Sequence, residues 1–149
     1  MGKIKVVYLL VTALFMLTSC NRVMKGDELK NTDIKRMRAL HLLDEKECVI
    51  RFYSEYENKY AGNFYTDKRI ASYWIDPGNA SKNKVFSALY TEVKSLDTVY
   101  DAGLTYCSYI RVTRKDGTIF QVCAGERRND VSLFFEGVFK QWKAHIKQN

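Results

Sequence analysis

The chain has 149 residues, of which 46% are hydrophobic and 13% aromatic, and this composition excludes an intrinsically disordered protein. A single proline and eight glycines also exclude a low-complexity repeat. The net charge of +7 is spread along the sequence without a run of five or more like charges, so it indicates solubility rather than a nucleic-acid-binding tail.

The N-terminus has the pattern of a secretory signal peptide. Lys3 and Lys5 precede an apolar run over Val6–Leu17. This run is shorter than the roughly 20 apolar residues that a helix needs to cross the hydrocarbon core of a bilayer. We therefore expect residues 1–19 to be a signal peptide and not a transmembrane helix.

The end of this run, Leu17-Thr18-Ser19-Cys20, resembles a bacterial lipobox. The resemblance implies that the Cys20 sulfur receives a diacylglycerol and that the chain is cleaved between Ser19 and Cys20. Two or more acyl chains hold a protein at a membrane almost permanently. A soluble secreted protein and a retained signal anchor are the alternatives. Asn21, where Asp would imply inner-membrane retention, favours the outer membrane if the host is Gram-negative. We therefore expect a lipid-anchored envelope protein.

The segment after the cysteine is short and polar. We expect residues 20–31 to be a tether that joins the lipid to a single domain over residues 32–149. The domain is expected to begin with a short helix over Ile34–Leu43, in which apolar residues recur at a spacing of three and which Thr32 or Asp33 caps. The acidic stretch Asp44–Glu47 that follows is typical of a solvated linker.

From Cys48 the apolar period changes to two, which is typical of strands with one buried face. The predicted strands are Cys48–Tyr53, Asn63–Thr66 and Arg69–Ile75, with a bend at Asp67-Lys68 before the last. Residues 76–79 (Asp-Pro-Gly-Asn) are a strong turn signal. Lys84–Tyr100 combines helical spacing with strand-forming residues, and we interpret it as strand structure with a bulge near Ser95.

The next segment predicts a hairpin around Lys115-Asp116-Gly117. A three-residue loop with a left-handed Gly117 places Val112 opposite Phe120 and makes one face continuously apolar, whereas a two-residue loop does not. We therefore expect the three-residue loop. A final amphipathic helix over Val131–Ile146, capped by Asn129 or Asp130, then supplies an apolar stripe that a sheet must cover.

Strands that end in one aromatic-faced helix indicate an α+β, mainly β fold, in which a bent antiparallel sheet or partly open barrel is closed by the C-terminal helix. The chain resembles the bacterial pleckstrin-homology-like (PH-like) domains. The resemblance rests on Val49–Ser54, on Gly62–Ile70, on the late Asp116-Gly117 turn and on the closing helix. It implies a scaffold that binds proteins, peptides or lipids and that is seldom catalytic.

Three cysteines remain besides the expected anchor. In the three-residue-loop register Cys107 and Cys123 are diagonal neighbours, and these are about 7–8 Å apart, which is too far for a disulfide. We expect them to be unbridged unless a bulge near Gly125 shifts the pairing. Cys48 is expected to be reduced and packed as a small apolar residue. Without Cys-x-x-Cys spacing or a histidine close in sequence to a cysteine, we expect no metal and no cofactor.

One cluster is a candidate partner-binding surface. Asp67, Lys68 and Arg69 form a charged turn that could meet an acidic partner or a lipid headgroup, and Tyr65 and Tyr73 lie in the flanking strands. A solvated turn is the favoured alternative for the charges, and packing in a half-buried sheet is the favoured alternative for the tyrosines. Residue His145 has no orienting partner in the sequence, so no catalytic residues are predicted.

We expect a non-enzymatic, lipid-anchored envelope module that binds an unidentified envelope protein or peptide and no nucleic acid. A second hypothesis is an immunity or inhibitor lipoprotein that neutralises a toxin or hydrolase. A third is a small envelope hydrolase with an unrecognised site, which would require a deep polar pocket with a perturbed titrating group.

Overall fold

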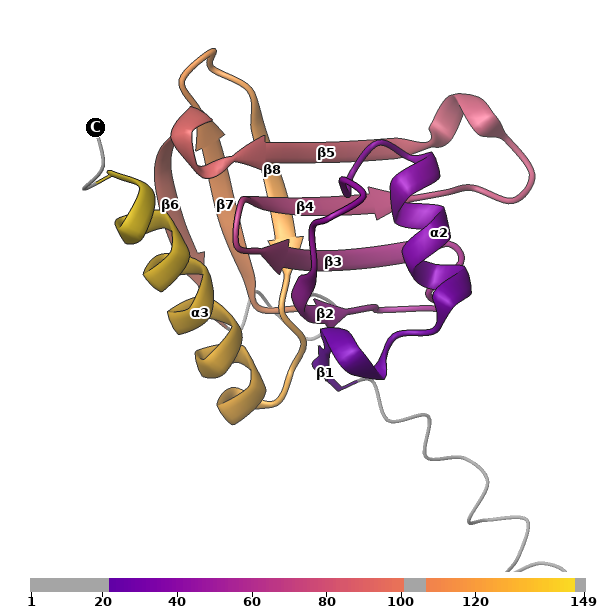
Figure 1. Cartoon of the computed structure of the whole chain (residues 1–149), viewed down its shortest axis with the longest axis horizontal. Helices are drawn as coiled ribbons and strands as arrows, with labels where there is room; N and C mark the ends of the chain where they lie inside the picture. Colours follow the sequence, from indigo (N-terminus) through magenta and orange to yellow (C-terminus); the bar gives the residue numbers. More distant parts are fainter. Residues whose placement is uncertain (1–21, 101–106, 147–149) are drawn as a thin grey trace, which may run out of the picture.

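The computed structural model describes residues 22–100 and 107–146, so the expected signal peptide and the lipobox cysteine, Cys20, lie outside the described residues. In the described part, two antiparallel sheets pack face to face with their strands crossing, and a long helix lies across one end (Figure 1). This is the expected open, antiparallel barrel closed by a C-terminal helix.

The five-stranded sheet has the order β1-β2-β3-β4-β5, and the three-stranded sheet has the order β6-β7-β8. In chain order the elements are β1 (Met24–Lys25), η2 (Gly26–Glu28), α2 (Asn31–Ala39), β2 (Val49–Tyr53), β3 (Ala61–Thr66), β4 (Arg69–Trp74), η3 (Ala80–Lys82), β5 (Lys84–Leu89), η4 (Tyr90–Glu92), β6 (Val93–Val99), β7 (Tyr109–Arg114), β8 (Ile119–Cys123) and α3 (Arg128–Ile146).

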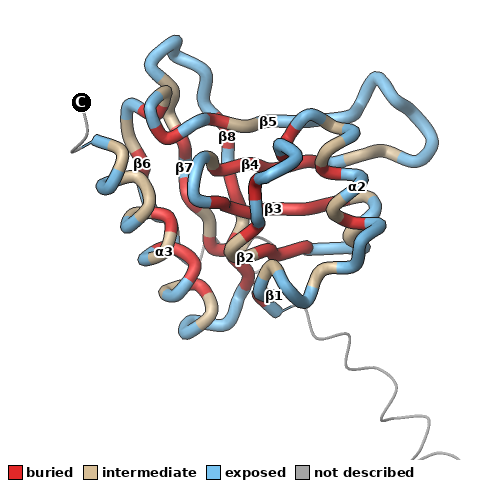
Figure 2. The backbone as a smooth tube through the Cα atoms, in the orientation of Figure 1, coloured by how far each residue is buried: buried red, intermediate tan, exposed pale blue. Residues whose placement is uncertain are grey.

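The central strands β3 and β4 of the five-stranded sheet are buried on both faces, as their red colour in Figure 2 illustrates. Successive side chains alternate between the faces. Tyr65 and Ile70 belong to the inner core, which lies between the two sheets and under α3. Phe64 and Ala71 belong to a second, outer core that includes Met37 of α2. The α2 helix therefore covers a face that would otherwise be exposed and apolar.

The segment expected to be a tether is part of the folded domain from Arg22 onward. Met24 pairs with Phe52 in the sheet, and Val23 is buried in the inner core. Arg22 forms an ion pair with Glu28 at 2.7 Å. The expected tether over residues 20–31 is therefore folded from Arg22 onward, which the sequence did not reveal because a strand of two residues is too short to leave a periodic signal.

The first helix begins and ends earlier than predicted. It begins after Lys30, whose backbone N–H donates to the Asp33 carboxylate at 3.3 Å, so Asp33 lies in the first turn and is not the cap. It ends at Ala39, and His41 adopts a positive φ of 58°. Leu42 and Leu43 complete the apolar repeat from the loop that follows, where both are buried.

The ambiguous segment 84–100 is strand structure, as predicted. The pairing of β6 with β7 shifts between Val93 and Ser95, where the bulge was expected. Within this segment the sequence did not predict η4, a single turn that leads from one sheet to the other. The Glu92 carboxylate stabilises it by accepting a hydrogen bond from the Leu89 N–H at 3.0 Å.

The β7–β8 hairpin has the predicted register. Val112 pairs with Phe120, and the N–H of Arg114 donates to the Thr118 carbonyl at 2.8 Å across a three-residue loop. Gly117 has the left-handed φ of 89° that this loop requires. The final helix also forms, although it begins at Arg128, before the expected caps.

Two predictions about the cysteines are wrong. Cys107 and Cys123 form a disulfide with their Cα atoms 5.7 Å apart. The ladder is irregular just beyond β8: the N–H of Ser108 donates to the carbonyl of Gly125, which has a φ of 94°, although its register partner is Ala124. This is the bulge that was named as the exception. Cys48 is free but exposed, because the alternation of this segment buries its neighbours Glu47 and Val49.

Candidate functional site

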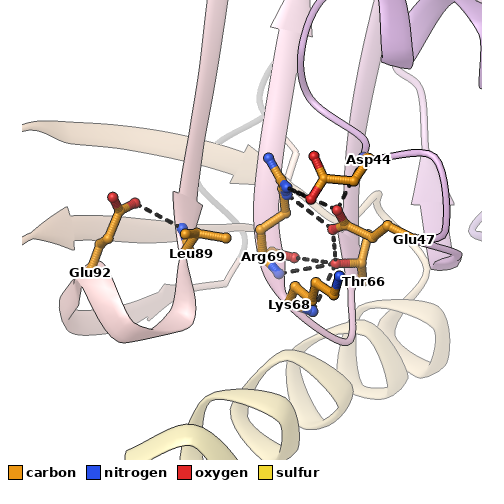
Figure 3. Close-up of polar contacts among 7 residues, drawn as sticks. All are labelled: Asp44, Glu47, Thr66, Lys68, Arg69, Leu89 and Glu92. Atoms are coloured by element: carbon orange, nitrogen blue, oxygen red, sulfur yellow. Dashed lines mark hydrogen bonds and ion pairs between the residues drawn. The ribbon is translucent and has the colours of Figure 1, made fainter.

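The predicted charged turn is largely structural (Figure 3). Thr66 Oγ1 accepts hydrogen bonds from the backbone N–H groups of Lys68, at 2.9 Å, and Arg69, at 3.0 Å. The Arg69 guanidinium lies 2.9 Å from the Glu47 carboxylate and 2.8 Å from that of Asp44. The Glu47 side chain is fully buried, so this arginine neutralises a carboxylate that was expected to be solvated. Asp67 and Lys68 are exposed.

The two predicted tyrosines point to opposite faces of the five-stranded sheet. Tyr65 lies in the inner core, where its ring meets Phe134 edge-on with ring centroids 5.1 Å apart. Tyr73 lies in the outer core, and its hydroxyl donates to the Asn58 carbonyl. Burial raises the pKa of both phenols. The five predicted residues therefore do not form one surface.

A groove that sequence reasoning missed lies between the two sheets. It has a volume of about 460 Å³, and we call it the inter-sheet groove. One wall comes from β3, β4, β5 and the segment after β2, and the other from β8. Its lining residues are Glu55, Asn63, Ser72, Tyr73, Trp74, Lys84, Phe86, Ile119, Phe120, Gln121 and Cys123.

The groove exposes large apolar side chains. Trp74 is 40% exposed, Phe86 37% and Ile119 59%. Phe86 stacks on Phe120 with ring centroids 5.6 Å apart, which joins the two sheets at the base of the groove. The Trp74 ring lies 6.5 Å from that of Tyr56, which is itself exposed. Single exposed apolar residues are ordinary, whereas several in one concave site are typical of binding surfaces.

Two hydrogen bonds of the Asn63 side chain link polar groups in the groove. The Asn63 Nδ2 donates to the Glu55 carboxylate at 2.6 Å, and its Oδ1 accepts from the Cys123 N–H at 2.9 Å. Glu55 as a residue is exposed, and its carboxylate is partly desolvated where it meets Asn63. The resulting loss of hydration raises the pKa of Glu55, against the smaller effect of the hydrogen bonds that it accepts.

A larger pocket of about 600 Å³ lies beside β1 and α2. Two of its charged side chains already have partners: Arg38 donates to the Glu45 carbonyl at 2.7 Å, and Glu47 pairs with Arg69. Among the residues that the structure describes, no aromatic side chain lines this pocket, whereas the inter-sheet groove has four, and we therefore consider the inter-sheet groove the better candidate site.

Among the described residues, no histidine lines the groove, and Glu55 is the lining carboxylate. Within residues 22–100 and 107–146, no three His, Cys, Asp or Glu side chains lie close enough together to hold a metal ion. In the same residues, no helix is both long enough and apolar enough to span a bilayer. Residue His145 lies on α3, with its Nδ1 2.8 Å from the Gln141 carbonyl oxygen. What the groove offers is apolar surface with one partly desolvated carboxylate.

The large apolar residues of the groove were visible in the sequence, but their exposure could not be predicted from it. Trp74 and Phe86 follow the same alternation as the buried Ile70 and Ala88, with Phe86 paired to Ser72 and Ala88 to Ile70. An alternating pattern therefore predicts that both are covered. They are exposed because β8 crosses only part of this face and leaves the end of the barrel open.

Comparison with known proteins supports the fold alone. No protein-family model matches the chain, and no curated protein matches its sequence. Among solved structures it is similar to a DUF1696 family protein with a pleckstrin-homology domain from Shewanella loihica PV-4, with 10% sequence identity and a TM-score of 0.50. The match covers 83% of this chain and 97% of that chain. The domain therefore has a PH-like fold, in agreement with the resemblance in its sequence.

Proposed function

We propose that this chain is a lipid-anchored protein of the bacterial cell envelope, and that its domain binds a protein or peptide partner at the inter-sheet groove without catalysing a reaction. The observation that carries the proposal is the exposure of Trp74, Phe86 and Ile119 around one concave site. Large side chains that remain exposed in a groove are well suited to binding, because a partner that covers them gains contact area at little entropic cost.

The groove is better suited to a peptide than to chemistry. Its exposed titratable groups are Glu55 and Lys84, and among the described residues neither a histidine nor a free cysteine lines it. Its walls are mainly strands of the two packed sheets, which favours a preformed site over one that must be ordered on binding.

The lipobox-like residues support the anchor. Only Asn21 separates Cys20 from Arg22, where the described structure begins, and Val23 is already buried. At about 3.3–3.6 Å per residue, an acylated Cys20 would hold the start of β1, four residues further on at Met24, within roughly 14 Å of the membrane surface. The partner would therefore be met at or close to the membrane.

Site-specific photo-crosslinking tests the proposal in the intact envelope. A photoreactive side chain at Ile119 is expected to capture a discrete partner, and the capture should be lost when Trp74 is changed to Ala. The matched control is Leu133 on α3, which is 48% exposed but lies outside the groove. Equal capture at Ile119 and Leu133, or capture that persists in Trp74→Ala, would contradict the proposal.

A further inference from the structure

The β8 strand has an unpaired edge along the inter-sheet groove. In an antiparallel ladder, hydrogen-bonded and non-hydrogen-bonded pairs alternate. Arg114 and Thr118 form a hydrogen-bonded pair at one end of the hairpin, and the Ala124 N–H donates to Ser108 at the other. The even-numbered residues of β8 therefore bond to β7, and the main-chain groups of Ile119 and Gln121 point away from it.

The next edge group along the strand shows that this edge accepts polar partners. The Cys123 N–H, which also points away from β7, is bonded by the Asn63 side-chain oxygen at 2.9 Å. An amide oxygen thus occupies the position that a carbonyl of a neighbouring strand would take. Among the described residues, no backbone partner is found for the edge-facing N–H groups of Ile119 and Gln121.

In the part of the chain that the structure describes, the β8 edge also lacks the residues that normally prevent a strand from pairing with another chain. Such edges are usually protected by lysine, proline or a covering element. Ile119–Cys123 contains neither a charged residue nor proline. Both Ile119 and Gln121 are exposed, and the apolar surface of Trp74 and Phe86 lies beside them in the groove.

We infer that the β8 edge accepts an extended peptide as an additional strand, bonded to the main chain of Ile119 and Gln121. This inference rests on the proposed function, because it concerns the same groove. Alternate side chains of the added strand would face Trp74 and Phe86, so the groove would select peptides with apolar residues at every second position.

The charge of the groove identifies one further feature of the peptide. Glu55 accepts a hydrogen bond from Asn63, and within the described residues it takes part in no ion pair. A carboxylate that is partly desolvated beside an apolar groove is best complemented by a cation. The peptide should therefore carry a lysine or arginine at the end that reaches Glu55.

The probes are two capped heptapeptides, Lys-Thr-Val-Thr-Val-Thr-Val and its reverse, which place the lysine and all valines on one face in either strand direction. The full chain in detergent is titrated with each, and amide hydrogen exchange is measured by NMR. In the bound state, exchange at Ile119 and Gln121 should slow at least roughly tenfold, as for newly formed hydrogen bonds. Phe120 and Val122, already bonded to β7, should not change.

The lysine contact has its own control. Replacing the peptide lysine by glutamate, or changing Glu55 to Gln, should weaken binding roughly tenfold or more, whereas Glu57→Gln should not. Glu57 is a suitable control because it is exposed and pairs with Lys59 outside the groove.

Three results would overturn the inference. Peptide binding that leaves exchange at Ile119 and Gln121 unchanged would mean that the groove binds side chains alone, and the proposed function would stand. Failure of both peptides to bind at about 1 mM would reject this peptide chemistry, while photo-crosslinking at Ile119 would still decide the proposed function separately. Protection that rises with protein concentration in the absence of peptide would mean that a second copy of the chain occupies the edge.

Discussion

Gly137 of α3 lies directly against Tyr65 of β3: a Cβ atom at position 137 would overlap the tyrosine hydroxyl and its ring. The absence of a side chain at this position lets α3 approach the sheet, where Tyr65 also meets Phe134. The contact fixes the helix at the end of the barrel opposite the open groove. A helical glycine that is costly in isolation is therefore required by the packing.

We predict that Gly137→Ala destabilises the domain by about 1–3 kcal/mol, as overpacked cores do, although alanine favours a helix over glycine by about 1 kcal/mol. Chemical denaturation measures the change. Adding Tyr65→Phe removes the overlapping oxygen and should restore part of the loss, and a double mutant that loses as much as the sum of the single mutants would show that the two residues do not interact.

Arg69→Ala is expected to destabilise the domain by about 3–5 kcal/mol, because it leaves the buried Glu47 carboxylate without its cation. The neighbouring Lys68→Ala is the matched control and should change stability by less than about 0.5 kcal/mol, since Lys68 is exposed. Urea unfolding of the two variants gives the comparison. Similar losses for both would mean that the pair in Figure 3 does not stabilise the turn.

The disulfide between Cys107 and Cys123 should leave one free thiol, that of Cys48, when the denatured and unreduced protein with acylated Cys20 is titrated. The bridge spans 16 residues of sequence. Its removal by Cys107→Ser and Cys123→Ser should cost about 3 kcal/mol, through the greater entropy of the unfolded chain. A count of three thiols would contradict the bridge.

Partial desolvation of the Glu55 carboxylate gives the stability a dependence on pH. The pKa of Glu55 in the folded protein is raised above the ordinary 4.5, so the folded state holds the proton of this carboxyl more tightly than the unfolded state. The resulting contribution to stability is fully present below pH 4.5 and is lost as the pH rises through the folded pKa. Glu55→Gln keeps an acceptor for Asn63 and removes the charge. The Tm of this variant relative to wild type should therefore rise between pH 4 and pH 7, and a Tm difference that is flat or falls would reject the raised pKa.

The β7–β8 register could be predicted from sequence because a slip of one residue would turn Phe120 and Val122 away from the core. The same reasoning could not find the groove. Alternation shows which face of a sheet a side chain occupies, but not how far the second sheet extends over that face. Trp74 and Ile70 lie at alternating positions on the same face of β4, yet Trp74 is exposed and Ile70 is buried. The disulfide was missed for a related reason, since the irregular pairing at Gly125 depends on one backbone angle.

The anchor is testable separately from the groove. Cys20→Ala should abolish acylation and release the protein from the membrane fraction, because the acyl chains on Cys20 are the proposed attachment to the bilayer. Fractionation of cells and mass spectrometry of the N-terminus give the answer. A Cys20→Ala protein that is cleaved normally and stays in the membrane fraction would contradict the lipid anchor.

The most direct test of the groove as a partner site is the affinity of peptides selected from a random library on the wild-type chain. Their Kd is measured for wild type, for Trp74→Ala and for Leu133→Ala, with the Tm of each variant confirming that it is folded. We predict a loss of roughly tenfold or more for Trp74→Ala, as for a central aromatic contact, and no loss for Leu133→Ala. Equal affinity for all three proteins would show that the inter-sheet groove is not the binding site.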